Sequence, residues 1–171
     1  NRIANGKFSI DGHQYSLEKN NNGHTLHSAS SALNTKMWKG RAYTTKDAAV
    51  LELTTTSPDG DAGFPGTLNV AVTYTLSNDN TLTVNYKATT DKPTVCNLTQ
   101  HSYFNLFGAG NGSILNHEVT INADAYTPVD KTLIPTGEIR SVEGTVFDFR
   151  KPKPVGSRIE FKDDQLKAGG G

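Results

Sequence analysis

Two stretches in which large apolar and polar residues alternate constrain the fold of this chain more than any other feature. Large apolar side chains occupy every second position from Leu68 to Leu76, and again from Leu82 to Tyr86. This period of two places one face of a strand on a core and the other face toward solvent. The four polar residues 77–80 between the stretches suit the loop of a hairpin. We therefore expect two neighbouring antiparallel strands.

Weaker strand signals lie at residues 7–10, 14–17, 49–56, 94–99 and 118–122. Turn sequences separate several of them, because proline fixes φ and glycine permits a positive φ, as at 57–60 and 64–66. No window of a dozen residues has the 3.6-residue apolar period of a helix. From Asp124 onward, frequent prolines favour long loops over strands. The sequence therefore predicts an all-β architecture, most simply an antiparallel β-sandwich.

The charge balance and the apolar runs argue against several classes of function. Lysine and arginine together number 17, as do aspartate and glutamate, so no basic surface for nucleic acid or an anionic membrane is expected. The apolar runs are too short to span a bilayer. Cys96 is the single cysteine, so no internal disulfide forms. Glycosylation sequons begin at Asn97 and Asn111, but Asn97 lies in an expected strand, where a glycan would fit poorly.

The most informative segment for chemistry is residues 97–106. If this segment is extended, His101, Tyr103 and Asn105 share one face of the strand. A histidine, a phenol and an amide on one face suit a polar ligand, and a histidine can donate a proton near neutral pH. On this pattern alone, a surface or structural histidine is the commoner explanation. The alternatives of a catalytic and a structural His101 therefore stay open at this point.

Two other patterns contain some of the residues that bind metals, but neither contains a full set of ligands. His24 and His27 are three residues apart, but their surroundings resemble a turn, and no nearby cysteine or carboxylate completes a zinc site. Asp59 and Asp61 resemble the start of a calcium loop, but the later ligands of such a loop are missing. The sequence predicts turns at both places and no metal.

Several motifs, taken in order, resemble the aldose 1-epimerase family. They occupy residues 1–4, 6–8, 26–27, 57–60, 63–66, 97–106, 133–137 and 146–150. The resemblance implies an antiparallel β-sandwich of the galactose mutarotase-like supersandwich type, about twice as long as this chain. Residues 1–171 are then expected to be part of a single sandwich domain that is incomplete, without the family's first strands and its C-terminal part.

The resemblance also implies a reaction, the interconversion of α and β anomers of hexoses such as glucose and galactose by ring opening and reclosure. By resemblance, His101 is the general acid, whereas Arg2, His27 and Tyr103 bind the sugar, and Asn1 is expected beside them. The reaction needs no metal or other cofactor. The family's general base is a glutamate expected beyond the end of this chain, so the remaining half of the enzyme is one expected partner, as a second chain.

Some expectations differ from the family or stay open. The family has a glycine pair where this chain has Ser28 and Ala29, so the shape of that loop is in question. Two alternatives to a mutarotase are a non-catalytic carbohydrate-binding sandwich and an inactive fragment that lacks the general base. The resemblance implies a cytoplasmic protein, and a secreted one stays open.

Overall fold

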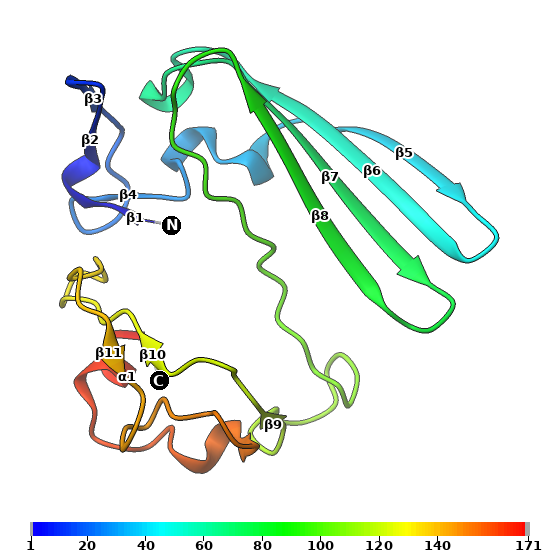
Figure 1. The fold of residues 1–171 in the computed structure, drawn as a ribbon, viewed down its shortest axis with the longest axis vertical. Coiled ribbons are helices and arrows are strands. Elements are labelled where there is room, and N and C mark those ends of the chain that lie inside the picture. Colours follow the sequence, from blue (N-terminus) through cyan, green and yellow to red (C-terminus); the bar gives the residue numbers. More distant parts are fainter. Residues whose placement is uncertain (1, 170–171) are drawn as a thin grey trace. The chain divides into compact units, whose positions relative to one another are not determined.

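The fold described here is that of a computed structural model, which describes residues 2–169 (Figure 1). The chain divides into two compact units, Asn1–Gln100 and His101–Gly171, and each is described by itself. Within residues 2–169, no helix is long and apolar enough to cross a membrane. Nearly all regular structure is antiparallel β-sheet, as the sequence predicts.

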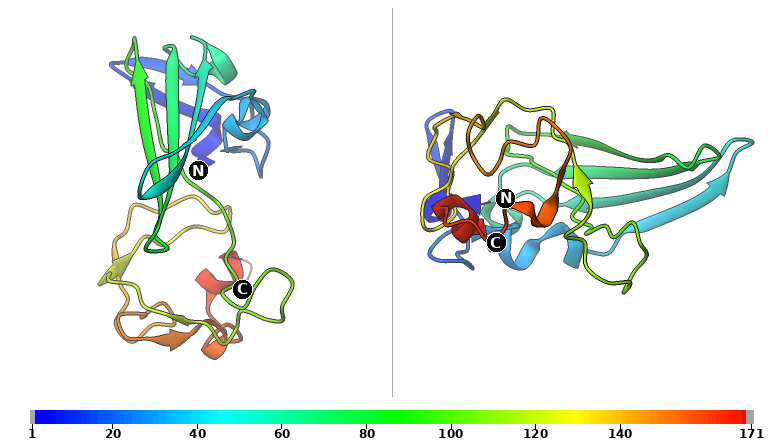
Figure 2. Two further views of the ribbon diagram at one scale, coloured as in Figure 1. Left: turned by 90° about the vertical axis from the view of Figure 1, so that its right-hand side faces the viewer. Right: turned by 90° about the horizontal axis from the view of Figure 1, so that it is seen from below.

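The first unit contains one antiparallel sheet of four strands in the order β5-β6-β7-β8. These strands are β5 (Lys39–Thr44), β6 (Ala48–Ser57), β7 (Leu68–Ser77) and β8 (Leu82–Thr90). Figure 2 shows the strands side by side from two further sides. The expected hairpin is confirmed, with Leu76 opposite Leu82 and the chain reversing through polar residues 77–81.

One face of this sheet is apolar over its whole length but buried over only part of it. Val70 and Val72 are almost fully buried, with 2% and 6% of their surface exposed. Farther along the same face, Leu51, Leu76 and Leu82 are 38%, 54% and 52% exposed. The apolar face that the alternation predicts therefore needs a second layer to cover it. It is covered at the end with Val70 and Val72 and open at the end with Leu76 and Leu82.

Short elements make up the rest of the first unit. They are the pair β1 (Arg2–Ile3) and β4 (Thr25–Leu26), the hairpin of β2 (Lys7–Ile10) and β3 (His13–Ser16), and the 3-10 helices η1 (Ala4–Gly6), η2 (Ala29–Ser31), η3 (Leu33–Thr35) and η4 (Asp61–Gly63). The ring of Phe8 stacks on those of Tyr15 and Phe64, with centroids 5.2 Å and 5.8 Å away. These contacts fix the β2–β3 hairpin to the loop that follows β6.

The second unit consists mostly of ordered loops. Its elements are β9 (Glu118–Val119) paired with β12 (Lys153–Pro154), β10 (Ala125–Tyr126) paired with β11 (Arg140–Ser141), η5 (Val155–Ser157) and the helix α1 (Asp164–Gly169). Side chains hold these loops, since Gln165 of α1 bonds both the N–H and the carbonyl of Val129, at 2.7 Å and 2.9 Å. The proline-rich part of the sequence thus forms loops, as expected.

Three local expectations need correction. Residues 94–99 form no strand, because no described strand pairs with them and an extended segment needs a ladder partner. The strand expected over 118–122 shortens to Glu118–Val119. The six-residue helix α1 was not expected, since it is too short to show a helical period.

Candidate functional site

The pairing of two very short strands brings the backbone of Arg2 near that of His27. Arg2 lies directly opposite Leu26, the residue before His27. The Arg2 Nε group donates a hydrogen bond to the Asn21 side-chain oxygen, 3.3 Å away, which restrains the guanidinium. Arg2 is half-buried and His27 is exposed. Asn1, the third residue expected here, lies outside the described residues.

The buried interior behind this strand pair fixes its position. His24 is buried, and its Nδ1 accepts a hydrogen bond from the Asn5 N–H at 2.8 Å. Thr25 is 2% exposed, and its hydroxyl donates to the Glu18 carbonyl at 2.6 Å. His24 Nδ1 must be unprotonated to accept this bond. His24 therefore has a structural role, and it supports the backbone that carries Arg2 and His27.

The loop after Leu26 has an unusual backbone conformation. His27, Ser28 and Ala29 all lie in the left-handed region, with φ of 52°, 61° and 51°. For a residue with a side chain, this conformation costs about 1–2 kcal/mol. The glycine pair expected from the family resemblance would adopt this conformation without strain. With Ser28 and Ala29 in its place, this chain forms the turn, but the turn is strained.

Hydrogen bonds on both sides hold this left-handed turn. Before it, the Asn20 side chain accepts from the Leu26 N–H at 2.8 Å and donates to the Leu26 carbonyl at 3.0 Å. After it, both the N–H and the hydroxyl of Ser30 donate to the Glu18 carboxylate. Strained conformations persist only where the surrounding contacts over-determine them. The turn at His27 meets this condition.

A second carboxylate, that of Asp61 in η4, binds side chains from the segment that follows the turn. It forms an ion pair with Lys36, and the side chains of both residues are less than 20% exposed. The Ser57 and Ser31 hydroxyls also donate to it. Burial opposes ionisation of Asp61, but these hydrogen bonds and the Lys36 charge outweigh it and lower the pKa of Asp61 to about 2.

A small hollow of about 90 Å³ adjoins this cluster. Ser28, Asp61 and residues 94–98 are among the residues that line it. The same segment continues along the chain to the expected acid, His101. The turn at His27 and the segment 94–98 are therefore neighbours within the first unit.

His101 and Tyr103 lie side by side in the second unit. Their ring centroids are 5.3 Å apart with an angle of 50° between the rings. This is the relationship that an extended segment gives to residues two apart, as expected from the sequence. Both side chains are exposed, Tyr103 by 90%. The imidazole and the phenol are therefore both open to solvent in this unit.

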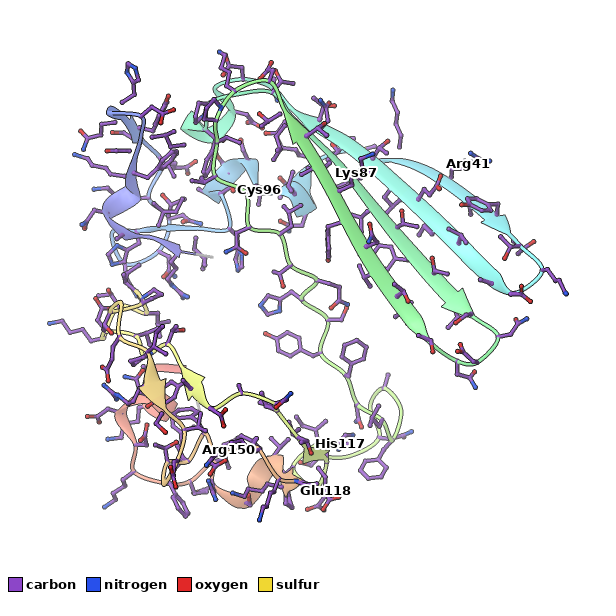
Figure 3. All side chains as sticks on the ribbon, in the orientation of Figure 1. Arg41, Lys87, Cys96, His117, Glu118 and Arg150 are labelled. Atoms are coloured by element: carbon purple, nitrogen blue, oxygen red, sulfur yellow. The ribbon has the colours of Figure 1, made fainter. Side chains whose placement is uncertain are left out.

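His117 lies just before β9 (Figure 3) and bonds Leu106, at the end of the segment 97–106. Its Nε2 accepts a hydrogen bond from the Leu106 N–H at 2.9 Å, and its ring packs edge-on against Phe107 at 4.8 Å. The Asn105 side chain also accepts from the Phe107 N–H at 3.0 Å. His117 could not be predicted as a contact from the sequence, because nothing in its spacing indicates a bond to a residue eleven positions earlier.

The two aspartates that resemble a calcium loop have structural partners. Asp59 forms an ion pair with Lys92 and accepts the Gly66 N–H at 2.6 Å, whereas Asp61 binds Lys36. Within residues 2–169, no three histidine, cysteine, aspartate or glutamate side chains lie close enough to hold a metal. The expected turn at these positions is confirmed, and Asp61 gains a role that sequence reasoning did not assign.

Comparisons with known proteins agree on one family. A family model described as aldose 1-epimerase matches residues 1–169. A galactose mutarotase of Sus scrofa is 48% identical over 160 residues, which are 94% of this chain and 45% of that protein. An aldose 1-epimerase of Escherichia coli K12 is 40% identical over 170 residues, 99% of this chain and 48% of that protein.

A solved structure gives the same result for the fold. The galactose 1-epimerase of Lactobacillus acidophilus NCFM superposes with a TM-score of 0.90 at 32% identity, over 99% of this chain and 50% of that one. This chain thus spans about half the length of the curated relatives that it matches.

Proposed function

Because this chain belongs to the aldose 1-epimerase family, we propose that the whole protein interconverts the α and β anomers of hexoses such as glucose and galactose. The observation that carries the proposal is the family match, which runs through residues 1–169. Two arrangements support it: the rings of His101 and Tyr103 are neighbours, and Arg2 pairs with the residue before His27. The resemblance assigns His101 as the general acid and the other three residues to sugar binding.

The proposed chemistry is acid–base catalysis of ring opening. His101 donates a proton to the ring oxygen while a base removes the proton of the C1 hydroxyl, so the bond between C1 and the ring oxygen breaks and an aldehyde forms. Rotation about the bond between C1 and C2 followed by the reverse proton transfers gives the other anomer. Each positioned acid or base contributes about 10²–10⁴-fold to the rate. No electron transfer is involved.

The other site residues hold the sugar in this proposal. The Arg2 guanidinium and the His27 imidazole donate hydrogen bonds to ring hydroxyls, and the resemblance adds Asn1 to the residues that bind the sugar. Tyr103 packs against the His101 ring, which limits the orientations that the imidazole can adopt. Such positioning contributes to the rate because the proton donor must lie within hydrogen-bond reach of the ring oxygen.

We further propose that both units belong to one β-sandwich domain, which the remaining half of the enzyme completes. The exposed apolar end of the sheet supports this, since Leu51, Leu76 and Leu82 lie there without a covering layer in the first unit. The relatives are about twice as long as this chain, enough for a second layer and for the general base. That half comes either from the same chain or from a second one.

Polarimetry tests the proposed function. Freshly dissolved α-D-galactose and α-D-glucose are followed with and without the protein, expressed over its whole natural length. We expect the optical rotation to reach equilibrium faster in proportion to the protein concentration. Saturable binding of galactose without any acceleration would contradict the proposal and identify a carbohydrate-binding sandwich. Neither binding nor acceleration would leave an interaction or structural domain.

A further inference from the structure

From the strained turn at His27, we infer that Asp61 is a positioning residue that holds the His27 imidazole where it binds the sugar. The inference rests on the proposed function, because His27 is assigned to the sugar there. It goes beyond that function, because Asp61 is not among the residues that the family resemblance assigns. Its basis is the set of contacts between η4 and the segment that follows His27.

The backbone of the turn after Leu26 is strained. Three consecutive residues with side chains, His27 to Ala29, are left-handed, and η2 begins at Ala29 without a side-chain cap at Ser28. A turn of this kind relaxes unless contacts outside it hold its ends. The orientation of His27 therefore depends on whatever anchors the residues that follow it.

Besides Glu18, which binds Ser30, a second carboxylate anchors the segment that follows the turn. Ser31, at the end of η2, and Lys36, just after η3, both bind the Asp61 carboxylate. Ser57, at the end of β6, binds it as well. One carboxylate thus ties the segment after His27 to the end of the four-stranded sheet. Because the side chain of Asp61 is only 14% exposed, water does not replace these bonds readily.

Among the described residues, the neighbouring aspartate, Asp59, makes no such link. Asp59 lies two residues away in the same loop and also forms an ion pair, but its described partners are Lys92 and Gly66. Neither partner belongs to the segment 27–36. Asp59 therefore stabilises the loop without contacting the turn, and it provides a matched control for Asp61.

The test compares Asp61→Asn with Asp59→Asn in the whole protein by steady-state polarimetry. Loss of positioning alone should raise the KM for galactose about tenfold in Asp61→Asn, with kcat changed less than about threefold. Asp59→Asn should leave the KM within about twofold. Adding Ser28→Gly and Ala29→Gly to Asp61→Asn should bring the KM most of the way back to the wild-type value. The reason is that glycine removes the strain that drives the turn to relax. A KM that is unchanged in Asp61→Asn, or raised equally by Asp59→Asn, would overturn the inference.

A second readout separates this inference from the proposed function. The backbone and imidazole NMR signals of His27 should shift in Asp61→Asn and stay in place in Asp59→Asn, whether or not the protein accelerates mutarotation. A wild-type protein without activity would overturn the proposed function, and the His27 signals would then decide the role of Asp61. Unshifted His27 signals in a folded Asp61→Asn protein would overturn that role.

Discussion

A methyl group placed on Gly63 would lie 2.5 Å from the carbonyl oxygen of Ser16. Gly63 also has a φ of 87°, so alanine there would be strained and would clash with backbone. We expect Gly63→Ala to lower the free energy of unfolding by about 3 kcal/mol or more, as measured by urea denaturation.

The control is Gly60→Ala in the same loop. Gly60 has a φ of 83°, but nothing lies within 4 Å of the added methyl group. The expected loss is therefore the backbone strain alone, about 1 kcal/mol. Equal losses for the two variants would contradict the close packing of Gly63 on β3.

The left-handed turn predicts a stabilising glycine substitution. Ser28 has a φ of 61°, and relief of its strain should exceed the entropy that glycine adds to the unfolded chain. We expect Ser28→Gly to raise the free energy of unfolding by about 0.5–1 kcal/mol. Ala32→Gly is the comparison, because Ala32 has an ordinary φ of −56° and should lose stability. A destabilised Ser28→Gly protein would show that the turn is not strained.

The lowered pKa of Asp61 predicts a change of stability with pH. Its folded-state pKa of about 2 lies below the ordinary value of 3.8, so its contribution is complete above about pH 4 and is lost as the pH falls toward 2. In Asp61→Asn, stability at neutral pH should be lower and its decline between pH 4 and 2 shallower. Asp47→Asn, which removes an equal charge from an exposed position, is the control. An unchanged decline in Asp61→Asn would contradict the buried ion pair.

Because one end of the sheet is apolar and exposed, a charge placed there should help the 171-residue chain and harm the whole protein. Leu76→Glu should make the 171-residue chain more soluble, because it breaks an exposed apolar surface. In the whole protein, the same change should lower the free energy of unfolding by about 2 kcal/mol or more, since the covering layer would bury the charge. Thr75→Glu, on the other face of the same strand, should do neither. A harmless Leu76→Glu in the whole protein would refute the covering layer.

Local patterns in the sequence were sufficient to predict the β7–β8 hairpin. The alternation from Leu68 to Tyr86 fixes which side chains share a face, and a hairpin needs only a short polar loop to set its register. Residues 94–99 have a similar composition but form no strand, because a strand depends on a partner and no local signal identifies one. The side-by-side arrangement of His101 and Tyr103 agrees with the expectation for an extended segment, in which residues two apart share a face.

The contacts that position the site could not be predicted in the same way. The pairing of Arg2 with Leu26 joins residues 24 positions apart through strands of two residues each, which are too short to show a period. The sequence predicts only a turn at Asp61, and the bond from Asp61 to Lys36 spans 25 positions. Such contacts depend on how separate loops pack, and a single sequence carries no direct record of them.

The most direct test of the central claim is the mutarotation rate of the whole protein with and without His101. His101→Ala should lower kcat/KM for α-D-galactose by about 10²–10⁴-fold while the protein stays folded. His13→Ala, which removes an exposed histidine from β3, should keep the wild-type rate. A His101→Ala protein that matches the wild-type rate would contradict the account, because the family's general acid would then lie elsewhere.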